Sequence, residues 1–144
     1  MKAQVEDARR QGATIVTGGR EPPGLKGAYY EPTLITDIKP SMRVWKEEVF
    51  GPVLPIVSYD KEDEAITLAN DTIYGLGGYI YTASRGRAER LASLMQTGMI
   101  SHNGTEFSAP YNPFGGYKIS GFRKTGGKYG FRDACRVKTV CLRK

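Results

Sequence analysis

Apolar and polar positions alternate along the chain in a way that predicts short helices between short strands. Near the N-terminus, Val5 and Ala8 have the spacing of one helix face, and Gly12 suits the left-handed residue that often ends a helix. Two more helices are predicted from apolar spacing, one after the N-cap candidate Asp60 and one after the N-cap candidate Ser84. The pattern therefore predicts one short helix in the first third of the chain and two helices in the middle.

The segments between these helices are rich in β-branched and aromatic residues, which favour strands. Five such segments are residues 13–19, 28–38, 53–59, 72–82 and 98–103. Residues 21–27, EPPGLKG, hold two prolines and two glycines and predict a loop. Strands that alternate with helices indicate an α/β architecture with a mixed, partly parallel sheet and flanking helices. We find no internal repeat and no linker.

Composition places the chain among soluble globular proteins. With 144 residues and 40% hydrophobic content it can bury the core of one domain, and no apolar run is long enough to cross a bilayer. The N-terminus lacks the apolar region of a signal peptide, so a cytoplasmic location is expected. Cys135 and Cys141 do not have metal-ligand spacing, which predicts free thiols and no metal site.

Positive charge is concentrated at the C-terminal end. Residues 117–144 hold nine basic residues and one acid, a net charge of +8, whereas the remaining 12 basic and 14 acidic residues give −2. Such clustering is one mark of nucleic-acid binding. The basic residues here are separated by Gly, Phe and Tyr without a recognised nucleic-acid module, so a solvated face or a surface for an acidic partner is the better interpretation.

Two glycine-rich segments do not have the spacing of phosphate-binding loops. YGLGGYIY has Ile80 where a dinucleotide fingerprint needs a small residue, and GFRKTGGKYG has Phe122 in place of the first glycine of a P-loop. His102 is the single histidine, and its place at the end of a predicted strand favours a structural role over a catalytic one.

A set of segments in fixed order carries a family resemblance. EEVFGPVLPI, ANDTIYGLGGYIYT, GMISHN, NPFGGYKISG and VKTV together resemble the C-terminal part of an NAD(P)-dependent aldehyde dehydrogenase. The resemblance covers essentially the whole chain, and the two motifs EEVFGPV and PFGGYKISG, about sixty residues apart, are specific. It implies a partial catalytic domain over residues 1–135 and an oligomerisation strand over residues 136–144.

The resemblance also assigns site residues. It implies that Glu48 binds the hydroxyls of the nicotinamide ribose of NAD or NADP and that Phe50 packs beside the nicotinamide. Adjacent residues of an extended chain point to opposite faces, so only one acid of the Glu47–Glu48 pair is expected to reach the coenzyme. Without the resemblance, both would be interpreted as solvated loop acids.

For the aldehyde, the resemblance implies a tunnel with Phe107, Ser108 and Phe114 nearest the substrate. A role for Phe107 and Phe114 as core aromatics is an equal alternative.

The chain departs from the family pattern in two respects. Where the family continues its SG with a glycine and an Arg-Glu pair, this chain has residues 122–125, FRKT, so the acid expected at Thr125 is missing. The family's cysteine nucleophile, its glutamate base and its coenzyme-binding domain all precede the matched region, and Cys135 and Cys141 match no catalytic position. No catalytic residue is therefore predicted here.

The sequence is thus interpreted as a fragment of an enzyme that oxidises an aldehyde to a carboxylic acid through a cysteine thiohemiacetal, with hydride transfer to NAD(P). The fragment alone is expected to be inactive and to form a homo-oligomer through its C-terminal strand, without contact to nucleic acid or membrane. The main alternative is a stand-alone pseudoenzyme that acts as an assembly module. A basic nucleic-acid-binding domain is a second alternative, which the sequence favours less.

Overall fold

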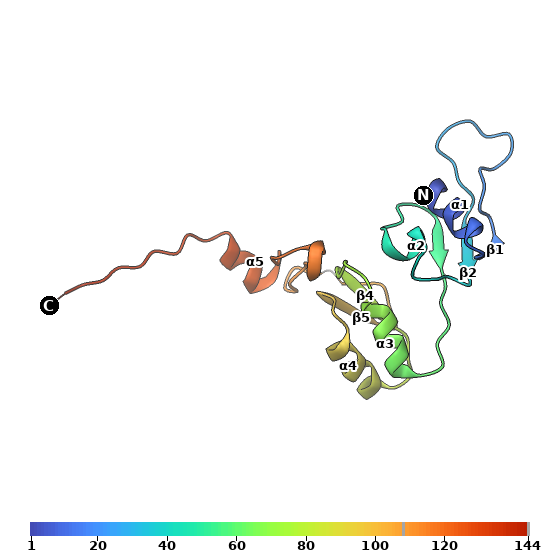
Figure 1. Ribbon diagram of the computed structural model, residues 1–144. Coiled ribbons are helices and arrows are strands. Elements are labelled where there is room, and N and C mark those ends of the chain that lie inside the picture. The colour runs from blue at the N-terminus through green and yellow to red at the C-terminus, as the bar shows by residue number, and fades with distance from the viewer. Residues whose placement is uncertain (108, 144) are drawn as a thin grey trace. The chain divides into compact units, whose positions relative to one another are not determined.

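The computed structural model of the chain describes residues 1–107 and 109–143. The chain divides into two compact units, Met1–Glu62 and Asp63–Lys144, and each contains a small sheet (Figure 1). The sequence indicated one domain without a linker. The boundary between the two units lies after strand β3, Val53–Pro55, at the first residue of helix α3, Glu62–Asn70.

The first unit opens with helix α1, Lys2–Arg10, as the apolar spacing predicted. Val5 and Ala8 lie on one face of α1, and both are completely buried. Gly12 follows the helix with a φ of +91°, in the left-handed region that glycine tolerates. This apolar face is part of a core cluster that also contains Ala13, Ile35, Met42 and Val44.

Three strands complete the first unit: β1, Thr14–Thr17; β2, Thr33–Thr36; and β3, Val53–Pro55. They form one sheet in the order β1-β2-β3, with β1 antiparallel and β3 parallel to β2. The prediction of a mixed, partly parallel sheet is therefore confirmed for this unit. Helix α2, Arg43–Lys46, lies between β2 and β3 in sequence and was not predicted, because one turn is too short for a visible periodicity.

The first part of the second unit alternates helices and strands: α3, Glu62–Asn70; β4, Gly77–Ile80; α4, Arg85–Leu94; and β5, Met99–His102. Strands β4 and β5 pair in parallel, so the second unit has a separate sheet and the chain does not form the single sheet that was expected. The predicted N-cap of α4 is confirmed, since the Ser84 side chain accepts a hydrogen bond from the backbone N–H of Arg87.

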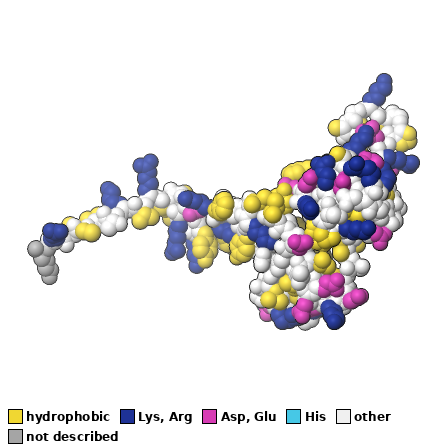
Figure 2. All heavy atoms as spheres, viewed as in Figure 1, with side chains coloured by type: hydrophobic (Ala, Val, Ile, Leu, Met, Phe, Trp, Pro, Cys, Tyr) yellow, Lys and Arg dark blue, Asp and Glu magenta, His cyan; other side chains and the backbone are white. Residues whose placement is uncertain are grey.

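The C-terminal part of the second unit holds a 3₁₀ turn at Lys118–Ser120 and helix α5 at Gly127–Asp133. After α5, the described residues 136–143 form no helix or strand within this single chain (Figure 1). Figure 2 shows basic and hydrophobic side chains along this tail, in which Val137 and Leu142 are 95% and 89% exposed. The oligomerisation strand at residues 136–144 stays a prediction, and Lys144 lies outside the described residues.

Among the helices of the described residues, none has the length and apolar content that crossing a membrane requires.

Candidate cofactor and substrate site

The two adjacent acids of the EEVFGPV motif have different surroundings. Glu47 directly follows α2 with extended backbone, and its carboxylate accepts hydrogen bonds from Nε and Nη2 of Arg43 at 2.7 and 2.9 Å. The guanidinium of Arg43 holds the pKa of Glu47 below its usual range, first through these hydrogen bonds. Glu47 therefore forms an ion pair with Arg43, four residues earlier at the start of α2.

Glu48 is bound through its backbone and not through its carboxylate. Its carbonyl oxygen accepts a hydrogen bond from Nε2 of Gln4 at 3.1 Å, while its exposed side chain has no hydrogen bond or ion pair with the rest of the described chain. Phe50, two residues later, is 81% exposed. Glu48 and Phe50 thus expose a carboxylate and an aromatic ring two residues apart in sequence, and these two groups fit the hydroxyls and the flat ring of a nucleoside.

Of the three residues predicted to line the aldehyde tunnel, Phe107 is the most buried of those described. Its ring lies 4.9 Å from the ring of Tyr79, centroid to centroid, with an interplanar angle of 37°. It also covers Gly77, where an added Cβ would lie only 2.8 Å from the Phe107 ring. Phe107 thus packs against β4 and is half-buried, which agrees with both a core role and a tunnel wall.

Phe114 is more open, with 40% of the residue exposed. Its backbone pairs with Thr125 in both directions, at 2.7 Å for its N–H and 2.8 Å for its carbonyl. Ser108, the third predicted tunnel residue, lies outside the described residues. Glu48 and Phe50 belong to the first unit, whereas Phe107 and Phe114 belong to the second.

Two lysines of the basic C-terminal region bind backbone carbonyls, so their assignment to a solvated face was wrong. Nζ of Lys124 lies 2.5 Å from the carbonyl oxygen of Gly115, 3.4 Å from those of Gly98 and Gly116, and 4.9 Å from the centroid of the Tyr117 ring. Burial lowers the pKa of Lys124. This lysine stands in the FRKT departure and holds the Gly115–Gly116 turn that follows Phe114.

Lys118 of the GGYKISG motif binds backbone carbonyls of the ANDTIYG motif, where helix α3 ends. Its Nζ donates to the carbonyl oxygens of Asn70 and Thr72 at 2.7 and 2.8 Å. Asn70 is the last residue of α3, and its side chain donates to the carbonyl of Leu94 and accepts from the N–H of Gln96 at the end of α4. The motifs ANDTIYG and GGYKISG are therefore joined in space, although 46 to 48 residues separate their contacting groups.

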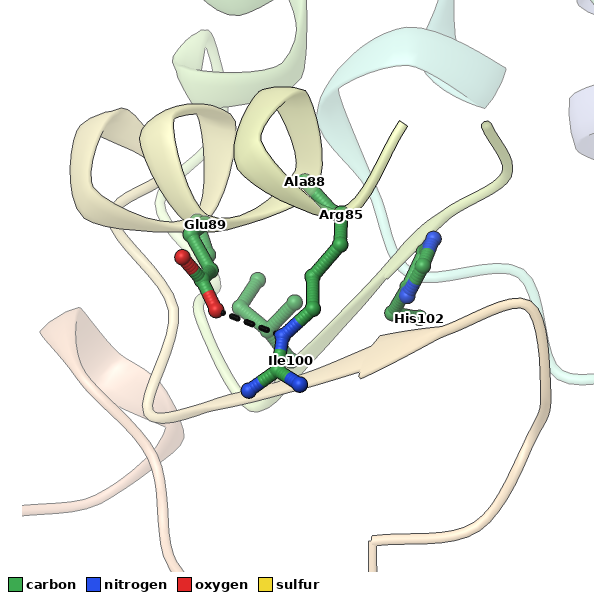
Figure 3. A pocket seen from close by; sticks show the side chains of 6 residues that line it. Arg85, Ala88, Glu89, Ile100 and His102 are labelled. Atoms are coloured by element: carbon green, nitrogen blue, oxygen red, sulfur yellow. Dashed lines mark hydrogen bonds and ion pairs between the residues drawn. The ribbon is translucent and has the colours of Figure 1, made fainter. Parts of the chain in front are cut away.

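His102 is bound to backbone, as a structural role predicts. Its Nε2 lies 2.9 Å from the carbonyl oxygen of Thr82, which also accepts a hydrogen bond from Asn103. The ring lines a shallow pocket between α4 and β5 together with Arg85, Ala88, Glu89, Ala92 and Ile100. Figure 3 shows Arg85 between Glu89 and His102, with the ion pair to Glu89 at 2.9 Å. The lining side chains include no nucleophile next to the histidine.

The two cysteines, Cys135 and Cys141, are free and exposed, in agreement with the prediction of free thiols. Within the described part of the chain, no group of three or more His, Cys, Asp or Glu side chains could hold a metal ion.

Comparison with known proteins identifies relatives across nearly the whole chain. The family model described as the aldehyde dehydrogenase family matches residues 1–140. Peroxisomal aminoaldehyde dehydrogenase 1 of Pisum sativum is 46% identical over 137 residues, which cover 94% of this chain and 27% of that enzyme. The non-phosphorylating aspartate-semialdehyde dehydrogenase of Halomonas elongata is 44% identical over 141 residues, 97% of this chain and 28% of that enzyme.

A solved structure is similar as well. The crystal structure of Mycobacterium tuberculosis aldehyde dehydrogenase complexed with NAD+ matches with a TM-score of 0.86 and 37% identity, over 92% of this chain and 27% of that one. The chain thus spans about a quarter of the length of the curated relatives that it matches, 27% of the pea enzyme. With 140 of its residues matched by the family model, the chain belongs to the aldehyde dehydrogenase family.

Proposed function

We propose that this chain is the C-terminal part of the catalytic domain of an NAD(P)-dependent aldehyde dehydrogenase, and that the whole enzyme oxidises an aldehyde to a carboxylic acid. The observation that carries the proposal is the exposed carboxylate of Glu48. It has no bond to the other described residues, whereas the adjacent Glu47 is bound to Arg43. The relatives that are named as aldehyde dehydrogenases support the same reaction class.

Within this proposal, Glu48 orients the coenzyme. An ionised carboxylate accepts two charge-assisted hydrogen bonds from a vicinal diol, and a bidentate contact of this kind defines an orientation that a single bond does not. Phe50, two residues later in sequence, offers an exposed ring against which an aromatic face of the ligand can pack. The coenzyme, when bound, supplies the hydride acceptor for the oxidation.

The aldehyde is proposed to lie against Phe107 and Phe114, with Ser108 as the third wall residue. Phe107 is held by Tyr79 and Gly77, and the segment after Phe114 is held by Lys124. Side chains and turns that are fixed in this way provide a preformed apolar wall, which is how small-molecule pockets exclude water and select shape.

The test of this function is Glu48→Gln in a full-length chimera, made by placing this chain in the pea enzyme in place of the 137 residues that match it. The change keeps size and removes charge, so the productive placement of NAD(P) is expected to weaken by roughly 1.5 to 3 kcal/mol, which is about a 10- to 150-fold loss in kcat/KM for the coenzyme. The measurement is steady-state kinetics with varied coenzyme, accompanied by the melting temperature.

Glu47→Gln is the matched control, because it changes the neighbouring acid that binds Arg43 instead of the coenzyme. It is expected to leave the coenzyme kinetics nearly unchanged. If Glu48→Gln leaves the kinetics unchanged and lowers the melting temperature, Glu48 is structural and the proposed function fails.

A second expectation is that the 144-residue chain alone does not oxidise aldehydes. Its two thiols, Cys135 and Cys141, are free and exposed near the C-terminal end, whereas a cysteine nucleophile needs activation, for example by an adjacent base. The assay follows NADH or NADPH formation with aliphatic and aromatic aldehydes. Turnover that disappears in Cys135→Ser or Cys141→Ser would contradict this expectation.

The alternative function, an assembly module, is favoured by one observation, the exposed apolar residues of the C-terminal tail. Val137, Val140 and Leu142 are 95%, 68% and 89% exposed. Such residues are usually covered in an assembly. Nucleic-acid binding is weakened as an interpretation, because Lys118 and Lys124 of the basic region bind carbonyl oxygens.

A further inference from the structure

Helix α2, which immediately precedes Glu47 and Glu48, lacks a side-chain cap at its start. It has only four residues, Arg43–Lys46, and its N-cap residue Met42 has no side-chain oxygen. Isolated helices of this length are unstable, and their first N–H groups need a partner. Something outside α2 must therefore hold it in place.

That partner comes from α1. Oδ2 of Asp7 accepts a hydrogen bond from the backbone N–H of Arg43 at 3.0 Å, at the start of α2. Asp7 is buried, and Nε2 of Gln11 donates to the same oxygen at 2.8 Å. The hydrogen bond from Arg43 is the first reason why the pKa of Asp7 lies below its usual value, so the carboxylate is ionised at neutral pH, as a cap requires.

A second contact from α1 holds the chain just after α2. Gln4 precedes Asp7 by three residues and so lies on the same helix face. It is 4% exposed, and its Nε2 donates to the carbonyl oxygen of Glu48 at 3.1 Å. Met1 packs on Gly51, where any side chain would overlap the methionine sulfur.

Gln4 and Asp7 thus bind the two ends of the segment that runs from the start of α2 to Glu48. The Glu48 carbonyl faces α1, while the Glu48 carboxylate remains exposed. If the backbone of one residue is already ordered in the folded protein, its conformational entropy is not lost when the ligand binds. The ligand then binds roughly tenfold more tightly than it would to a disordered residue.

We propose that Gln4 is a positioning residue for the coenzyme: its hydrogen bond to the Glu48 backbone, together with the Asp7 bond to Arg43, orients the Glu48 carboxylate before NAD(P) binds. This inference rests on the proposed function of Glu48. Gln4 does not touch the coenzyme in this proposal and acts through the backbone of Glu48; its side chain also interacts with the neighbouring Glu47 carboxylate.

The first test uses Gln4→Met in the 144-residue chain, since methionine has a similar length and no donor. Hydrogen exchange is measured for the amides of Trp45 and Glu47, which donate to the carbonyl oxygens of Met42 and Arg43 at 3.1 and 2.8 Å, and their rates are divided by that of Ile35 in the core strand β2. The exchange ratio is expected to rise about tenfold, the equivalent of one lost hydrogen bond. Gln96→Met, the same change at an exposed position of the second unit, is the control and should leave the ratio unchanged.

Gln4→His is the conservative variant, because an imidazole N–H can still donate to the carbonyl, and it should restore most of the protection. An unchanged ratio in Gln4→Met would overturn the proposal by itself, without any activity measurement.

The second test uses the chimera described above. Gln4→Met is expected to raise KM for the coenzyme about three- to tenfold with little change in KM for the aldehyde, whereas loss of folding would lower the amount of active enzyme instead. If exchange increases but the coenzyme KM does not, Gln4 is merely structural and the inference is wrong. If Glu48→Gln itself has no kinetic effect, the proposed function fails, which distinguishes the two outcomes.

Discussion

At the scale of single residues, Thr33 links strand β2 to the glycine turn at Gly18–Gly19, which lies earlier in the sequence. Its hydroxyl accepts a hydrogen bond from the N–H of Gly19 at 2.8 Å and donates to the carbonyl of Glu31 at 2.7 Å, in a side chain that is 2% exposed. Gly18 beside it has a φ of +71°, and an added Cβ would overlap the carbonyl oxygen of Pro32. The TGG turn therefore requires both the glycine and the buried hydroxyl.

Thr33→Val should reduce the free energy of unfolding by about 1 to 3 kcal/mol, because it keeps the shape and leaves the buried N–H of Gly19 without its acceptor. Urea denaturation followed by circular dichroism measures the change. Thr36→Val, at the other end of β2, is the control, since the Thr36 hydroxyl donates to the exposed carboxylate of Asp37 and its loss should cost less than about 0.5 kcal/mol. Equal effects of the two changes would show that the Thr33 bonds do not stabilise the turn.

At the scale of elements, side chains from distant segments satisfy several helix ends. The start of α2 is bound by Asp7 of α1, and the end of α3 is bound by Lys118 from the 3₁₀ turn. A cation at a helix C-terminus also interacts favourably with the helix dipole. Among the helices whose N-caps are described, only α4 has a side-chain N-cap, Ser84, which its own sequence predicted.

Lys118→Met should destabilise the second unit by about 1 kcal/mol, because the carbonyls of Asn70 and Thr72 lose a charged donor while the aliphatic stem is kept. The expected signs are a lower melting temperature and faster hydrogen exchange in the last turn of α3. Lys128→Met is the matched control, since Nζ of Lys128 lies 5.2 Å from the Tyr129 ring on exposed α5 and should matter little. A Lys118 variant as stable as the Lys128 variant would show that the cap contributes nothing.

At the scale of the whole molecule, the C-terminal tail has apolar residues without cover. Within the described chain, residues 136–143 have no strand partner, yet the sequence RVKTVCLRK is rich in residues that favour strands. An unpaired extended segment invites pairing with another chain, and its basic residues limit random association. We therefore retain the proposal that this tail pairs between subunits.

Deletion of residues 137–144 should lower the mass of the particle in solution, since the proposed contact between copies would be lost. Light scattering coupled to size-exclusion chromatography measures the mass of both forms. A shortened chain that keeps the mass of the parent, or a parent that is strictly monomeric, would refute the subunit contact.

The sequence by itself determined several local elements and the family, whereas the single turn of α2 was missed. The positions of α1, α4 and β5 followed from apolar spacing, from Gly12 and from Ser84, because each signal lies within a few residues of the element that it marks. The motifs around Glu48 and Phe114 indicated the family for a related reason, since a motif is a local arrangement of residue types.

Only the tertiary structure decided what the polar side chains bind. Lys118 and Lys124 belong to one basic stretch, and nothing near them in sequence distinguishes them from its exposed lysines, yet their ammonium groups meet carbonyls as far as 48 residues away. Likewise, Gln4 meets Glu48 across 44 residues, and the strands divide into two sheets. A hydrogen bond depends on the positions of two groups in space, and for groups so far apart in the chain those positions exist only after the fold has formed.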